Sequence, residues 1–284
     1  MRILIAGCGD VGNALALKLL QNDHVVYGLK RDISTLPAQV EAVPADLTNP
    51  STLTGLPENI DRLVFMPTPA SRDRAAYEAV FIDGWKNLWS SLKQPPGRTI
   101  LASSTAVFGH SDGSIVDERT PPAPCRFNGQ VLLDMEQLAA SCTDHLVVVR
   151  IAGIYGPGRE GMLRLAASPD LEIQCHPPYF TNRIHLEDVS AALLHLLFVA
   201  APDGLYLACD DQPAPRYEVM EWLAKALGKS APTGLTVANG AGGKRVDNRR
   251  LRRSGFRLRF PDYRAGYGAI LAGTRNRSSN ETTN

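Results

Sequence analysis

The stretch RILIAGCGDVG, residues 2–12, decides how the rest of the chain is interpreted. Residues 2–6 form a short apolar run, which predicts a buried parallel strand. Glycines follow at positions 7, 9 and 12, and apolar residues at 11, 15, 16, 19 and 20 recur with the spacing of one helical face. A strand that leads through a glycine-rich turn directly into a helix predicts the first unit of an α/β fold.

The same alternation continues along the first half of the chain. Further strands are predicted at 24–29, 40–45, 62–66, 99–102 and 145–151, and helices at 77–92 and 131–142. This order predicts a Rossmann-type domain over residues 1–153, with a doubly wound parallel sheet. In residues 154–274, clusters of Pro and Gly interrupt the regular pattern of strands and helices. This stretch predicts a smaller, irregular α/β substrate-binding part, and some of its segments can return to the sheet. Residues 275–284 are polar and are expected to form a disordered tail.

The glycine-rich turn has the spacing of a phosphate-binding loop. Gly7-Cys8-Gly9-Asp10-Val11-Gly12 matches G-x-G-x-x-G in the required position between a strand and a helix. The first glycine permits a tight turn, the second lets the backbone approach a pyrophosphate, and the third allows close helix packing. Free N–H groups at the helix start would hold the phosphates. We therefore predict that these six residues bind a dinucleotide; the alternative is a glycine-rich turn without a ligand.

The end of the second strand bears on the choice between NADP and NAD. An acidic residue there would bind a ribose 2′-hydroxyl, but Lys30 and Arg31 stand at this position. Two cations attract a 2′-phosphate, so NADP is favoured, although NAD stays open because Asp32 could still reach the ribose. A solvated basic pair is the alternative. Asp46 could accept a hydrogen bond from the adenine amino group. Residues at or near strand ends complete the predicted cofactor site: Leu47, Met66 and Ser103.

Composition and charge exclude several classes of protein. The chain has 284 residues, 44% of them hydrophobic, which excludes disorder of the whole chain. A net charge of +1 gives no reason to expect nucleic acid or an anionic membrane as partner. No apolar run reaches the length of a membrane span. Five scattered cysteines fit a reducing cytoplasm and lack metal-site spacing, so we predict a cytoplasmic protein without a metal.

Three later motifs carry a family resemblance. They are the stretches ASSTAVFG at 102–109, IYGPG at 154–158 and RIHLEDV at 183–189. Together with the glycine loop, they resemble the signatures of the extended short-chain dehydrogenase/reductases, the NAD(P)-dependent epimerases and dehydratases. The resemblance covers about residues 2–270. It implies a Rossmann-type domain, a small substrate part, a nicotinamide cofactor and often a homodimer.

The chain departs from this family at the acid/base residues. The family usually carries Tyr-x-x-x-Lys, and alignment on the neighbouring motifs puts those positions at Arg126 and Gln130. An arginine does not exchange a proton at neutral pH. Ser104 matches the family's catalytic serine, with capping of its strand as the alternative role. Tyr155, His110 and His185 are candidates to replace the missing tyrosine, although packing, solvation and loop ordering explain them as well.

A basic segment near the C-terminus is a candidate anion site. Residues 244–259 hold eight basic residues and one acidic residue, a local charge of +7. The planar guanidinium of arginine can donate two parallel hydrogen bonds to a phosphate group. Arg249, together with Arg126 and Arg183, could therefore bind a phosphate-bearing substrate. A solvated basic surface is the alternative, and the lack of interleaved aromatic residues disfavours nucleic acid.

The leading hypothesis is an NADP-dependent oxidoreductase or epimerase/dehydratase with an atypical active site. Its substrate would be a small molecule such as a nucleotide-sugar or another anionic carbonyl or alcohol compound. The alternative hypothesis is an NADP-binding sensor or partner-binding protein without turnover, because the glycine loop is kept while Tyr-x-x-x-Lys is not.

Overall fold

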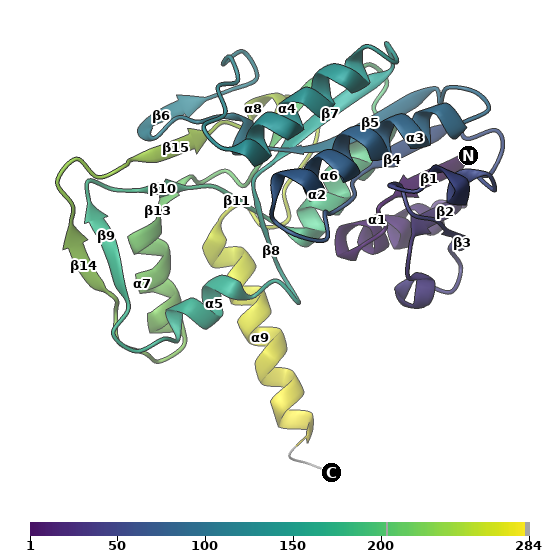
Figure 1. The fold of residues 1–284 in the computed structure, drawn as a ribbon. Helices are drawn as coiled ribbons and strands as arrows, with labels where there is room; N and C mark the ends of the chain where they lie inside the picture. The colour runs from purple at the N-terminus through teal and green to yellow at the C-terminus, as the bar shows by residue number, and fades with distance from the viewer. Residues whose placement is uncertain (203, 282–284) are drawn as a thin grey trace.

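A seven-stranded parallel sheet forms the centre of the computed structural model, which describes the backbone of residues 1–202 and 204–281 and side chains up to residue 273. Its order is β12-β7-β5-β4-β1-β2-β3 (Figure 1). The order runs outward in both directions from β1 and β4, so the predicted doubly wound α/β fold is confirmed. The strands are β1 (Arg2–Ala6), β2 (Val25–Lys30), β3 (Glu41–Pro44), β4 (Arg62–Phe65), β5 (Arg98–Ser104), β7 (Leu146–Ile151) and β12 (Leu205–Ala208).

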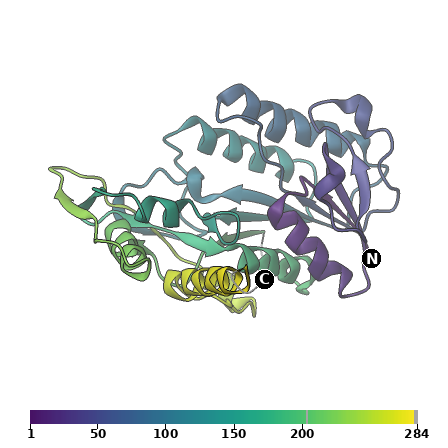
Figure 2. The same ribbon diagram turned by 90° about the horizontal axis from the view of Figure 1, so that it is seen from below.

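Helices cover both faces of this sheet (Figure 2). On one face lie α2 (Arg74–Glu78), a π-helical turn η3 (Ala79–Asp83), α3 (Gly84–Ser91) and α4 (Phe127–Ala140). On the other face, α1 (Asp10–Leu20) packs against α6 (Leu186–Phe198). Two hydrophobic clusters fill the layers, one around Trp85 and Met135 and one around Leu15 and Leu193. Their burial on both sides explains why the sheet strands are apolar runs without alternation.

The C-terminal part has its own core of aromatic and aliphatic side chains. It lies between α5 (Gly161–Ala166), α7 (Arg216–Ala226) and α9 (Tyr263–Glu281). Three small sheets accompany it: β13-β10-β15-β6 (Ala214–Pro215, Phe180–Thr181, Gly243–Val246, Asp112–Val116), β11-β8 (Arg183–His185, Gly153–Tyr155) and β14-β9 (Thr233–Thr236, Glu172–His176). The short helix α8 (Arg249–Arg253) packs instead against β12 of the main sheet.

Several boundaries differ from the sequence-based expectation. Strand β6, from the first 153 residues, joins a small sheet of the C-terminal part. Conversely, β12 and α6 return to the main sheet, which the expectation for segments of residues 154–274 had allowed. The single helix expected at 77–92 is divided by the π-helical turn. The backbone of residues 275–281 continues α9, and the rest of the expected tail lies outside the described residues. In the described part of the chain, no helix is both long and apolar enough to cross a membrane.

Candidate active site

The carboxyl ends of the parallel strands open into a groove made of two adjoining cavities. The first, of about 440 Å³, lies over the ends of β2 and β3; we call it the basic cavity because Lys30 and Arg31 line it. The second, of about 350 Å³, lies over the ends of β4, β5 and β7; we call it the serine cavity, after Ser103 and Ser104. Gly7 and Gly9 line both cavities. This is the side of an open parallel sheet where ligands bind.

The geometry of the glycine loop requires glycine at two positions for different reasons. Gly7 has φ +90°, and a Cβ there would lie 2.4 Å from Cα of Pro67, so a side chain is excluded. At Gly9 a Cβ would meet nothing within 4 Å, so this residue leaves open space beside the start of α1. Gly9 caps α1 without a side-chain hydrogen bond, which leaves the first amides of the helix free for an anion.

Every residue of the predicted cofactor set lines the groove. Gly7 and Gly9 line both cavities. The basic cavity also contains Cys8, Lys30, Arg31, Asp46 and Leu47. The serine cavity also contains Asp10, Val11, Gly12, Met66 and Ser103. The fold therefore brings these positions together along one groove.

The charges of the basic cavity are held in place by local hydrogen bonds. Lys30 Nζ donates to the Thr35 hydroxyl at 2.5 Å, and Nη1 of Arg31 lies 4.0 Å from the Asp46 carboxylate. Burial alone raises the pKa of Asp46, but hydrogen bonds from Thr48 and the charge of Arg31 lower it below its ordinary value. Asp46 is therefore ionised at neutral pH. The side chain of Arg31 is 65% exposed, so its guanidinium is accessible to a ligand although it pairs with Asp46.

The buried thiol of Cys8 is poorly suited to act as a nucleophile in this groove. Burial raises the pKa of its thiol to about 11, although the charge of Lys30 opposes the shift. A thiol with this pKa is protonated at neutral pH, and only the thiolate is reactive.

The two serines at the end of β5 have different surroundings. Ser104 is partly buried, lines the serine cavity and accepts a hydrogen bond from the Ala106 amide at 3.1 Å, as its capping role predicts. Ser103 donates to the Glu136 carboxylate at 2.5 Å. Glu136 is in turn held by Arg150 through three hydrogen bonds of 2.7 to 3.2 Å. Among the described residues, no neighbour accepts a hydrogen bond from the Ser104 hydroxyl, whereas the Ser103 hydroxyl donates to Glu136.

Helix α4 presents different residues to the groove from those that the sequence alignment selected. Arg126 is the residue before the helix and is exposed, and Gln130 is exposed and donates to Asp134. Asn128 and Leu132, one turn apart, are the α4 residues that line the serine cavity. Asn128 and Leu132 have the same four-residue spacing as Tyr-x-x-x-Lys, and this spacing lets both side chains face the groove from one side of the helix. Neither side chain exchanges a proton near neutral pH.

Tyr155 and His185 lie in the core, away from the groove. Tyr155 is 3% exposed, stacks on Tyr267 with ring centroids 4.4 Å apart, and lines neither cavity. Burial raises its pKa far above the ordinary value. His185 is buried, and its Nδ1 accepts from the Glu187 amide at the start of α6. This placement argues against the proton-transfer role that we considered for each, and His110 also lies outside both cavities.

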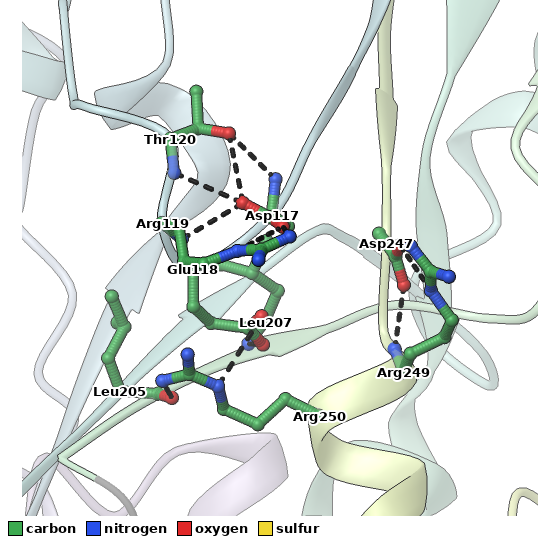
Figure 3. A network of polar contacts seen from close by, with 9 residues as sticks. All are labelled: Asp117, Glu118, Arg119, Thr120, Leu205, Leu207, Asp247, Arg249 and Arg250. Atoms are coloured by element: carbon green, nitrogen blue, oxygen red, sulfur yellow. Dashed lines mark hydrogen bonds and ion pairs between the residues drawn. The ribbon is translucent and has the colours of Figure 1, made fainter.

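The three arginines considered as an anion site lie in separate surroundings. Arg126 is exposed before α4, whereas Arg183 is 6% exposed and lies over the ring of Tyr263. Arg249 pairs with Asp247 at 2.5 Å in a network beside β12, which Figure 3 shows. In that network Arg119 pairs with Asp117 and Arg250 approaches Glu118 at 3.7 Å. Carboxylates thus compensate much of the positive charge, and the three residues form no common site.

Residues that the sequence analysis missed complete the serine cavity. Tyr77 and Phe81 approach from α2 and the π-helical turn, and Tyr77 packs edge-on against Phe81 and Phe127. Arg159 approaches from the turn after β8. The four-residue spacing of Tyr77 and Phe81 was the available signal, since both lie on one helical face. Among the described residues, no cluster of His, Cys, Asp and Glu could hold a metal ion.

The groove, the glycine loop and the doubly wound sheet together define a Rossmann-type fold. The sequence profile of the NAD dependent epimerase/dehydratase family matches residues 3–173. The chain belongs to this family, which confirms the resemblance drawn from the motifs.

Individual relatives cover nearly the whole chain. Protein YeeZ of Escherichia coli is 28% identical over 276 residues, which cover 92% of this chain and 97% of YeeZ. A 3-diazoavenalumate denitrifying reductase of Streptomyces is 27% identical over 261 residues, covering 84% of this chain and 85% of the reductase. A solved structure described as a candidate NAD-dependent epimerase/dehydratase from Methylobacillus flagellatus is 37% identical, with a TM-score of 0.83. The match covers 96% of this chain and 98% of the chain in that structure.

Proposed function

We propose that this chain is an NADP(H)-dependent oxidoreductase that acts on a small carbonyl or alcohol compound. The observation that carries the proposal is the groove, which has an open glycine loop in its middle, a basic pair at one end and a free serine hydroxyl at the other. The family membership and the similarity to a reductase support the same class of reaction.

The cofactor fits the residues along the groove. The space beside Gly9 and the uncapped amides of α1 suit a pyrophosphate. Lys30 and the exposed guanidinium of Arg31 suit the 2′-phosphate of NADP, and an acidic residue that would repel it is missing at their position. The serine cavity would then receive the nicotinamide and the substrate. When bound, the cofactor supplies or accepts a hydride.

The chain's own residues would orient the substrate and move the proton. Among the described residues, those with a hydroxyl group that line the serine cavity are Thr68, Tyr77, Ser103 and Ser104. Ser103 is engaged by Glu136, which leaves Ser104 to hold the substrate oxygen. Tyr77 carries the phenol that lines this cavity, and we assign the proton transfer to it because a phenol exchanges protons more readily than an alcohol.

The side chains around this position would exclude water from the reaction. Phe81, Leu132 and Ile151 line the cavity with apolar surface. An apolar wall strengthens each hydrogen bond to the reacting oxygen, because water no longer competes for it.

The test is a turnover screen of purified full-length protein with NADPH against aldehydes, ketones and nucleotide-sugars. We expect NADPH consumption with at least one class. Tyr77→Phe should lower kcat by about 10²-fold or more without changing NADPH affinity, whereas Tyr179→Phe, at an exposed tyrosine outside the groove, should have no effect. NADPH binding without turnover on any class would instead favour a sensor or partner-binding protein, and equal kcat for Tyr77→Phe would remove the proton-transfer assignment.

A further inference from the structure

An ion pair crosses the groove between the glycine loop and the C-terminal part. Nε of Arg159 lies 3.3 Å from Oδ2 of Asp10. Asp10 stands in the first turn of α1, directly after Gly9, and Arg159 closes a turn on Gly156 through a backbone hydrogen bond of 2.9 Å. Both side chains line the serine cavity beside Gly7 and Gly9.

Asp10 creates an electrostatic conflict for a phosphate-binding loop. A carboxylate in the first helical turn interacts favourably with the helix dipole, so it stabilises α1 when no other anion is present. The same carboxylate repels a phosphate group that binds the free amides of that turn. A loop that binds pyrophosphate beside Asp10 therefore needs a cation close to the carboxylate.

Arg159 is the cation that lies close to the Asp10 carboxylate. Among the described residues that line the serine cavity, Asp10 and Arg159 are the charged ones, and the other cations of the groove, Lys30 and Arg31, line the basic cavity instead. The Arg159 side chain is 37% exposed, so part of its guanidinium faces solvent in the groove. Five N–H donors in a planar fork allow one guanidinium to contact a carboxylate and a phosphate together.

We propose that Arg159 is a positioning residue that neutralises Asp10 and donates hydrogen bonds to the pyrophosphate of the bound dinucleotide. This inference rests on the proposed function, because it assigns a further contact to the same cofactor. Arg159 belongs to the turn after β8, so the contact ties the C-terminal part to the phosphate loop. A dinucleotide bound there would therefore be contacted by both parts of the chain.

The experiment compares two ligands on the full-length protein by calorimetric titration. NADPH contains the pyrophosphate. Adenosine 2′-monophosphate lacks it and is expected to bind in the basic cavity alone. We expect Arg159→Ala to weaken NADPH binding by about tenfold or more and to leave the affinity for adenosine 2′-monophosphate within about twofold. Arg164→Ala is the matched control, because Arg164 is an exposed arginine on the adjacent α5 that lines neither cavity.

Two further variants separate charge from folding. Arg159→Lys should recover part of the NADPH affinity because it keeps the positive charge. The recovery should be incomplete because lysine lacks the planar set of donors of a guanidinium. Asp10→Asn in the Arg159→Ala background should also recover part of it, because it removes the carboxylate that repels the phosphates. Unchanged NADPH affinity in Arg159→Ala, or an equal loss for both ligands, would overturn the role of Arg159. Wild-type protein that binds neither ligand would contradict the proposed function itself.

Discussion

Oε2 of Glu136 lies 2.7 Å from Nη2 of Arg150, and both side chains are buried directly behind the groove. The same carboxylate accepts the Ser103 hydroxyl, so a helix, α4, and two strands, β5 and β7, are joined by one polar cluster beneath the serine cavity. This cluster keeps Ser103 turned inward and leaves Ser104 as the serine that can meet a ligand.

Removal of one partner of this buried pair should destabilise the fold. Glu136→Gln leaves the Arg150 charge uncompensated in the core, and we expect the free energy of unfolding to fall by about 3–5 kcal/mol. Urea denaturation measures the change. Glu172→Gln, at an exposed glutamate on β9, should stay within about 0.5 kcal/mol of wild type. A loss below about 1 kcal/mol for Glu136→Gln would show that the pair is not a determinant of stability.

The two glycines of the phosphate loop should respond differently to a side chain. Gly9→Val should fold normally, because a Cβ at this position meets nothing within 4 Å, but it should abolish NADPH binding by filling the space for the pyrophosphate. Gly7→Ala should instead lower the melting temperature, because φ is +90° and the Cβ would lie 2.4 Å from Cα of Pro67. Circular dichroism and calorimetric titration distinguish the two effects. Normal NADPH affinity in Gly9→Val would place the ligand elsewhere.

Asp210 should make stability depend on pH near neutrality. Burial raises its pKa to about 7, although the charge of Arg183 opposes the shift. The folded protein therefore holds a proton on this carboxyl between about pH 4 and 7, where the unfolded chain has lost it, and stability falls as pH rises through that window. From a pKa difference of about 3, at about 1.4 kcal/mol for each, the loss is about 4 kcal/mol.

An amide at this position cannot ionise, so Asp210→Asn should remove this dependence. We expect the variant to be more stable than wild type above about pH 8 and to show a flatter stability profile in denaturant titrations at several pH values. Asp144→Asn, at an exposed aspartate, is the control and should follow the wild-type profile. Parallel profiles for wild type and Asp210→Asn would rule out titration of Asp210 in this range.

The fold could be predicted where local patterns decide it. The strand, glycine turn and helix at residues 2–20 are adjacent in the chain, and their apolar spacing specifies both elements. The placement of β6 and β12 depends on pairing with strands that are distant in sequence, Gly243–Val246 and Leu146–Ile151. A short apolar run does not indicate which edge it will join, so the sequence could not specify which segments would pair with which sheet.

The candidate site could likewise be predicted only where local sequence patterns decide it. The glycine loop and the residues after each parallel strand could be placed, because the carboxyl ends of these strands meet at one edge. The groove-facing residues of α4 could not, because the helix begins at Phe127, four residues before its expected start. Gly129 allows α4 to approach the Ala106 carbonyl, which a Cβ would meet at 2.3 Å. Likewise, Tyr155 is buried by α9, more than a hundred residues later in the chain.

The central claim is that the groove binds NADP(H) and that Lys30 and Arg31 select it over NAD(H). Calorimetric titration of wild-type protein and of the Lys30→Asp/Arg31→Ala variant with NADPH and NADH tests this claim most directly. We predict that wild type prefers NADPH by about tenfold or more and that the variant loses this preference while it still binds NADH. Wild-type protein that binds neither nucleotide, or a variant whose preference for NADPH is unchanged, would contradict the account.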